Sequence, residues 1–124
     1  MKYQQKLIIQ GELIDLNAFI SACKSHYSVA GRLKSENEEI IVWEAQKQKL
    51  KPIDTPCYMA YHWYCKNKRK DKSNVSSMGR KCIEDALQKC HVLKQDNWNA
   101  IIGHSDDYYI DKENPRIEII INYN

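Results

Sequence analysis

The chain has 124 residues, of which 43% are hydrophobic and 28% are charged, and these fractions are ordinary for one small globular domain. The net charge of +3 is too small to indicate a polyanionic partner by itself. No apolar run approaches the roughly 18 residues that a membrane span needs, and the N-terminal residues lack the long apolar core of a secretory signal peptide. We therefore expect a single domain over residues 1–124, with no membrane partner and a cytoplasmic location.

The first elements expected along the chain are a strand and a short helix. Residues 6–14 carry the apolar run of the predicted strand. Asp15 is a typical N-cap residue, and the apolar residues after it recur at helical spacing. That apolar stripe comprises Leu16, Phe19, Ile20 and Cys23.

A second helix is expected over residues 32–50, where good helix formers are common and helix breakers are few. Pro52 ends this helix. Its predicted inward-facing residues are Ile40, Trp43 and Ala45.

Residues 56–66 give the clearest strand pattern. Both alternating faces are largely apolar, which is typical of a central strand rather than an edge strand. The aromatic residues of this segment either pack in the core or stack on nucleic-acid bases, and we favour packing. They are Tyr58, Tyr61, Trp63 and Tyr64.

The segment that follows predicts an amphipathic helix. Its apolar residues form one stripe from Val75 to Cys90, and Ser73 or Asn74 is expected to cap its start. The opposite face carries Ser77, Lys81 and Asp85, spaced by four.

The C-terminal part predicts two more strands. Residues 97–103 form a short strand, and Asp106 and Asp107 are expected in an acidic loop after it. A turn at residues 111–115 then leads into a last strand over residues 116–123. Strands and helices are mixed along the chain, which predicts an α/β (α+β) fold with one small mixed sheet packed with helices.

The five cysteines include no CxxC pair, so we expect free thiols in a reducing compartment. On their predicted helix, Cys82 and Cys90 would lie about 12 Å apart. On their predicted strand, Cys57 and Cys65 would lie about 26 Å apart. Neither pair fits one tetrahedral zinc ion, so we expect buried structural cysteines.

Basic residues are concentrated between positions 66 and 81, a segment that we call the basic window. This window holds one acid, Asp71, and seven basic residues: Lys66, Lys68, Arg69, Lys70, Lys72, Arg80 and Lys81. A local basic patch on a balanced chain is typical of a protein that binds a polyanion. A solvated surface run is the alternative, and the charges alone do not exclude it.

The residues in and after the basic window include the types that phosphodiester hydrolysis needs. Carboxylates such as Asp71, Asp85 and Asp96 suit Mg²⁺ or Mn²⁺, because these cations prefer oxygen ligands. A lysine such as Lys81 stabilises charge that develops on the phosphate, and flanking cations bind neighbouring phosphates. The alternative is that the carboxylates are surface residues and that Lys81 and Asp85 form a helix ion pair.

These same residues resemble the RusA family of Holliday junction resolvases, and its phage-type members above all. The resemblance lies in three strings, Asn67-Lys-Arg-Lys-Asp71-Lys-Ser-Asn74, Gly79-Arg-Lys81-Cys-Ile-Glu-Asp85-Ala-Leu87 and Asp96-Asn-Trp98, and in the tail Asp111-Lys-Glu-Asn-Pro-Arg-Ile-Glu118. It is densest from Lys66 to Glu118, while the N-terminal half agrees mainly in the order of its elements.

The resemblance implies a homodimeric endonuclease that binds four-way DNA junctions and makes paired, Mg²⁺-dependent cuts. Asp71 matches the first aspartate of the family's Asp-x-Asp-Asn motif, Asn74 its asparagine, and Asp96 a later aspartate. Lys81 and Asp85 match a Lys-x-x-x-Asp-Ala-Leu element. The residues expected to grip the DNA are Lys66, Lys68, Arg69, Lys70, Lys72, Asn74 and Arg80.

The sequence departs from the family motif at Ser73, where the motif has its second aspartate. A hydroxyl is a neutral and weaker ligand for a hard cation than a carboxylate is. We expect Asp71 and Asp96 to hold Mg²⁺ or Mn²⁺, with Ser73 as a weaker ligand and Asp85 as an extra one. The alternative is a DNA-binding module with weak or no cleavage.

Overall fold

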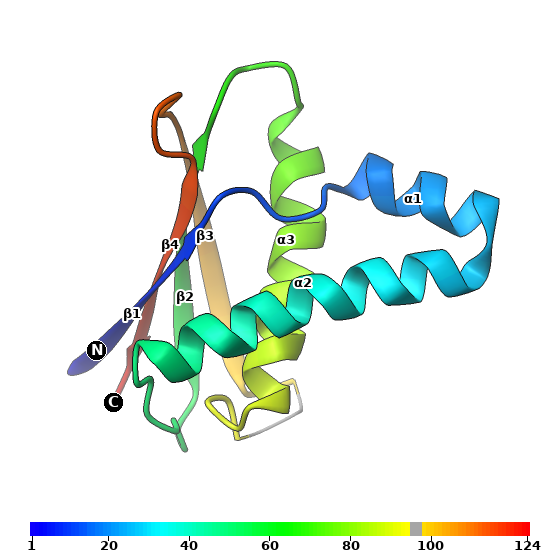
Figure 1. The fold of residues 1–124 in the computed structure, drawn as a ribbon. Coiled ribbons are helices and arrows are strands. Elements are labelled where there is room, and N and C mark those ends of the chain that lie inside the picture. Colours follow the sequence, from blue (N-terminus) through cyan, green and yellow to red (C-terminus); the bar gives the residue numbers. More distant parts are fainter. Residues whose placement is uncertain (95–97) are drawn as a thin grey trace.

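The computed structural model of the chain describes residues 1–94 and 98–124. Its elements are β1 (Tyr3–Gln10), α1 (Leu16–Ser25), α2 (Tyr27–Lys47), β2 (Cys57–Cys65), α3 (Lys72–Lys89), β3 (Ile101–Ile110) and β4 (Arg116–Tyr123). The strands form one sheet in the order β1-β4-β2-β3, with β2 and β3 parallel and the other neighbours antiparallel. The helices lie on one side of this sheet (Figure 1). The predicted α+β fold with a mixed sheet is therefore confirmed.

The central position of β2 was predicted correctly, since β4 and β3 flank it. The face of β2 toward the helices is buried from Cys57 to Trp63, and Tyr61 and Trp63 are 0% and 1% exposed there. These two aromatic residues therefore pack in the core, as predicted. The opposite face, which includes Tyr58 and Tyr64, is partly exposed, and the Arg116 guanidinium lies 3.8 Å from the Tyr64 ring centroid.

Helix α3 packs closely on the sheet, and its predicted apolar stripe is confirmed by buried Met78, Cys82, Ile83, Ala86 and Leu87. The closest approach is at Gly79. A Cβ atom placed on Gly79 would lie 2.7 Å from Cη2 of Trp63, so this position requires a residue without a side chain. Burial raises the pKa of the Cys82 thiol to about 11, and the buried thiol is therefore neutral.

The first strand and the first helix differ in part from the prediction. Strand β1 covers Tyr3–Gln10 instead of 6–14, because its pairing with β4 begins at Tyr3 and the chain turns at Gly11, where φ is +81°. Helix α1 begins after Asp15, as predicted. However, its predicted apolar stripe is largely exposed, because the helix packs through Ala22 and not through Leu16 or Ile20.

Helix α2 begins earlier than predicted and presents a different face. It covers Tyr27–Lys47 instead of 32–50. Ile41 and Ala45 are buried, whereas Ile40 and Trp43 are 49% and 59% exposed. The helix carries two apolar stripes, and contact with the rest of the fold selects the one through Ile41 and Ala45.

The largest correction concerns the segment before the last strand. Strand β3 runs from Ile101 to Ile110, so Asp106 and Asp107 lie in a strand and not in an acidic loop. Parallel pairing with β2 provides backbone hydrogen bonds along one side of this segment, and the Asp106 carboxylate accepts a hydrogen bond from the Trp63 indole at 2.8 Å. The turn at 111–115 and the strand β4 are confirmed.

Among the described residues, none of the helices has the length and apolar character needed to cross a bilayer.

Candidate nucleic-acid interface

The basic loop, residues 66–71, connects the end of β2 to the start of α3. Because β3 runs parallel to β2, its C-terminal end lies beside this loop. Carboxyl ends of parallel strands next to a helix N-terminus are a common place for ligand binding. A cleft with a volume of about 370 Å³ lies here. Its lining residues are Cys65, Asn67, Lys68, Lys70, Lys72, Val75, Tyr108, Tyr109 and Ile110.

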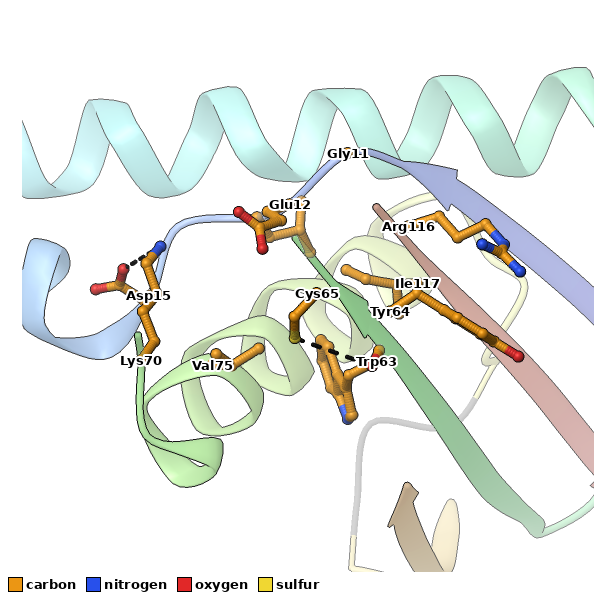
Figure 2. Close-up of a pocket in the computed structure, with 11 residues that line it drawn as sticks. Gly11, Glu12, Asp15, Trp63, Tyr64, Cys65, Lys70, Val75, Arg116 and Ile117 are labelled. Atoms are coloured by element: carbon orange, nitrogen blue, oxygen red, sulfur yellow. Dashed lines mark hydrogen bonds and ion pairs between the residues drawn. The ribbon is translucent and has the colours of Figure 1, made fainter. Parts of the chain in front are cut away.

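Two lysines of the basic loop are paired with acids from the segment before α1. Lys70 Nζ lies 2.7 Å from Asp15 Oδ2, and Lys66 Nζ lies 3.7 Å from Glu12 Oε1. The hydrogen bond to Asp15 raises the pKa of Lys70. Figure 2 shows Lys70 and Asp15 pointing toward each other beside a smaller hollow that Glu12 and Cys65 also line. These two ion pairs tie the basic loop to the segment before α1.

Three other cations have no such partner. Within residues 1–94 and 98–124, Lys68, Arg69 and Lys72 form no ion pair. The Lys72 ammonium lies 5.5 Å from the centroid of the Tyr108 ring, an attractive but weak arrangement. Of the residues expected to grip the DNA, these three offer their full charge to an approaching phosphate.

Asp71 lies among these cations as the N-cap residue of α3. The cap was expected at Ser73 or Asn74, and that prediction is wrong by two or three positions. The Asp71 side chain is exposed and makes no capping hydrogen bond. Nor does it form an ion pair with any other residue that the structure describes. Asp71 is therefore an exposed carboxylate without a described partner, between Lys70 and Lys72 in the chain.

Two residues expected at the DNA, Asn74 and Arg80, have partners within the fold. The Asn74 side-chain oxygen accepts a hydrogen bond of 2.8 Å from the backbone N–H of Asn17, in the first turn of α1. Arg80 Nη1 lies 2.6 Å from Asp106 Oδ2, and both side chains are about four-fifths buried. Arg80 thus belongs to the contact between α3 and β3. Sequence analysis missed this role of Asp106, because only the parallel pairing places it under the helix.

Lys81 and Asp85 form the helix ion pair of the alternative interpretation, at 3.3 Å. Asp85 is also paired with Lys34 of α2 at 2.8 Å. Burial alone would raise the pKa of Asp85, but the hydrogen bonds and charges of Lys34 and Lys81 lower it below its ordinary value. Glu38 joins the same network through Lys34 at 3.1 Å. Asp85 therefore links α2 to α3.

The three predicted catalytic residues that the structure describes lie at different places along α3. Asp71 and Asp85 are fourteen positions apart on α3, which corresponds to about 21 Å along the helix axis. Lys81 is ten positions, or about 15 Å, from Asp71. Asp96 lies outside the described residues.

The described residues do not by themselves complete a metal site. No group of three or more histidine, cysteine, aspartate or glutamate residues in the described part of the chain has the arrangement to hold a metal ion. Asp71 and Ser73 supply one carboxylate and one hydroxyl at the start of α3. Mg²⁺ usually keeps several waters and is held by one or two carboxylates together with substrate phosphates, so one carboxylate and one hydroxyl are a minimal set of protein ligands.

Neither a family model nor a curated protein matches this chain. The likeness to RusA resolvases thus rests on the quoted strings alone.

Proposed function

We propose that this protein binds branched DNA and cleaves its phosphodiester bonds as a homodimeric, metal-dependent endonuclease. The observation that carries the proposal is the free carboxylate of Asp71, which follows Lys68 and Arg69 in the basic loop and directly precedes Lys72. Carboxylates that stabilise a fold are normally paired, as Asp85 is. An unpaired acid inside a basic loop is instead suited to share a cation with a bound phosphate.

The three unpaired cations supply the DNA-binding part of the proposal. Lys68 and Arg69 extend from the basic loop, and Lys72 is the first residue of α3. The N-terminus of a helix carries partial positive charge from its free N–H groups, which favours a phosphate there. Asp71 is the described carboxylate that would hold Mg²⁺ or Mn²⁺ beside that phosphate, while Asp96, which the resemblance adds, lies outside the described residues.

A second candidate function is junction binding without cleavage. It is favoured by Ser73, which replaces a carboxylate of the family motif, and by the lack of a complete ligand group among the described residues. This candidate needs only the basic loop and the start of α3. The two functions differ in whether a metal ion at Asp71 leads to cleavage of the bound DNA.

The test is an assay with a synthetic four-way junction and a matched duplex, each with Mg²⁺, Mn²⁺ or EDTA. We expect the unmodified protein to bind the junction and to cut it only with a metal. Asp71→Asn should abolish cutting and keep binding. Asparagine is as good an N-cap residue as aspartate, and the Asp71 side chain makes no hydrogen bond with described residues, so the fold should be unchanged.

The other outcomes are equally informative. Cutting that persists in EDTA or in Asp71→Asn would refute the proposed mechanism. Binding without cutting, with cutting created by Ser73→Asp, would support the second candidate. Light scattering of the free protein should give about twice the chain mass of 14.6 kDa, and a monomer mass would contradict the proposed dimer.

A further inference from the structure

The cleft beside the basic loop has an apolar wall, which the binding of a phosphate backbone does not require. Cys65 and Ile110 are neighbours across the β2–β3 pair, and Val75 approaches them from α3. Burial raises the pKa of the Cys65 thiol, so this side chain is neutral. Ile110 is 49% exposed. An apolar surface that is open to solvent beside a ligand cleft indicates an apolar part of the ligand.

The aromatic residue of this wall is held in place. Tyr108 donates a hydrogen bond from its hydroxyl group to Ser76 Oγ at 2.7 Å, and Ser76 is itself 2% exposed and bonded to the Lys72 carbonyl at 3.1 Å. The Tyr108 ring is therefore fixed between β3 and the first turn of α3. A fixed ring loses little conformational freedom when a ligand packs against it.

The rim of the same cleft is cationic. Lys68 and Lys72 line it and have no ion-pair partner within the described part of the chain. Asn67 adds a polar side chain. The volume of about 370 Å³ is in the range of pockets that hold small ligands. An apolar wall below lysines matches a molecule with a flat apolar part and an attached phosphate.

We propose that the cleft binds one unpaired nucleotide of DNA, with its base against Tyr108 and Ile110 and its phosphate at Lys68 and Lys72. This inference rests on the proposed DNA binding and deepens it. A base inside a duplex has both faces stacked, so it cannot offer one to the wall. A base at a branch point or in a single strand can, and the cleft would then favour DNA with unpaired positions over continuous duplex.

The proposal is tested with two fluorescent 12-mers at equal salt, an oligothymidylate and an abasic oligomer with the same number of phosphates. Stacking of one base on a protein side chain changes affinity by about tenfold. We therefore expect the unmodified protein to bind oligothymidylate about tenfold more tightly in anisotropy titrations. Ile110→Asn should remove this difference by weakening oligothymidylate binding and leaving abasic binding unchanged.

Ile102→Asn is the matched control. Ile102 lies on the same strand, is 59% exposed, and is eight positions from Ile110, or about 26 Å along β3. This variant should keep the tenfold preference. Equal binding of both oligomers by the unmodified protein would overturn the nucleotide cleft and leave phosphate binding intact. If Ile110→Asn weakened the binding of both oligomers equally, the nucleotide cleft would be overturned as well. If the unmodified protein bound neither oligomer, the proposed DNA binding itself would be refuted.

Discussion

The closest approach between α3 and the sheet is at Gly79. The Cβ of an alanine there would lie 2.7 Å and 2.8 Å from two atoms of the Trp63 ring, and Trp63 is 1% exposed and cannot move freely. We predict that Gly79→Ala lowers the free energy of unfolding by about 1–3 kcal/mol, the usual effect of overpacking. Thermal or urea denaturation measures it.

Gly31→Ala is the control for this substitution. Gly31 also lies in a helix, but nothing lies within 4 Å of a Cβ placed there. Alanine favours a helix over glycine by about 1 kcal/mol, so Gly31→Ala should stabilise the protein or leave it unchanged. Equal effects of the two substitutions would show that helix propensity, and not contact with Trp63, decides the result.

Asp85 makes stability depend on pH. Lys34 and Lys81 hold its pKa below the ordinary value of 3.8, so its charged form stabilises the fold at neutral pH. The unfolded chain takes up this proton near the ordinary pKa, while the folded chain takes it up only at lower pH. The stabilisation by ionised Asp85 is therefore lost as the pH falls from about 3.8 through the lower pKa of the folded state. We predict that Asp85→Asn is less stable than the unmodified protein at pH 6 and loses less stability on acidification to pH 3. Parallel pH curves from urea denaturation would contradict this.

At the scale of elements, the start of α1 joins three segments of the chain. Asp15 Oδ1 accepts a hydrogen bond from the N–H of Ala18 at 2.8 Å, and its other oxygen pairs with Lys70 at 2.7 Å. Asn74 of α3 accepts from the N–H of Asn17 in the same turn. Helix α1 thus begins at this point because Asp15 and Asn74 accept hydrogen bonds from two of its first N–H groups.

We predict that Asp15→Ala lowers the free energy of unfolding by about 1–2 kcal/mol, because the helix loses its cap. Asp15→Asn keeps a good cap residue and removes only the charge, and it should therefore cost less. Urea denaturation of both variants separates the two contributions. If Asp15→Asn were as destabilising as Asp15→Ala, the ion pair with Lys70 would be the larger contribution.

In the whole molecule, ion pairs with acids balance four of the seven positive charges of the basic window. Lys66, Lys70, Arg80 and Lys81 are balanced by acids from the segment before α1, from β3 and from α3 itself. Only the basic loop and the first residue of α3 keep unpaired positive charge among the described residues of the window. Within this window, the folded chain therefore concentrates its unpaired positive charge at one end of the parallel strand pair.

This charge distribution predicts the salt dependence of DNA binding. Each phosphate contact contributes about 0.9 to the slope of log affinity against log salt concentration. Lys68→Met should therefore reduce the slope by about one for each chain that contacts the DNA. Lys24→Met, in the last turn of α1, should not change it. The measurement is a salt titration with fluorescent duplex or junction DNA, and equal slopes for both variants would contradict the interface.

The sequence by itself determined the features that local patterns encode. The apolar stripe of α3, the two apolar faces of β2, the cap at Asp15 and the turn before β4 were predicted correctly. Each depends on residues within one or two helical turns or within one strand. The sequence also showed the concentration of cations around Asp71, because the order of charged residues along the chain does not depend on the fold.

Only the tertiary structure decided which of these residues are free to act. The sequence shows no difference between Lys68 and Lys70, but the fold places Asp15 against Lys70 and leaves Lys68 exposed. Asp106 looked like a loop residue until parallel pairing with β2 placed it beside Trp63 and Arg80. The physical reason is that ion pairs and buried hydrogen bonds join residues far apart in the chain. Their partners are set by the packing of the elements and not by local sequence.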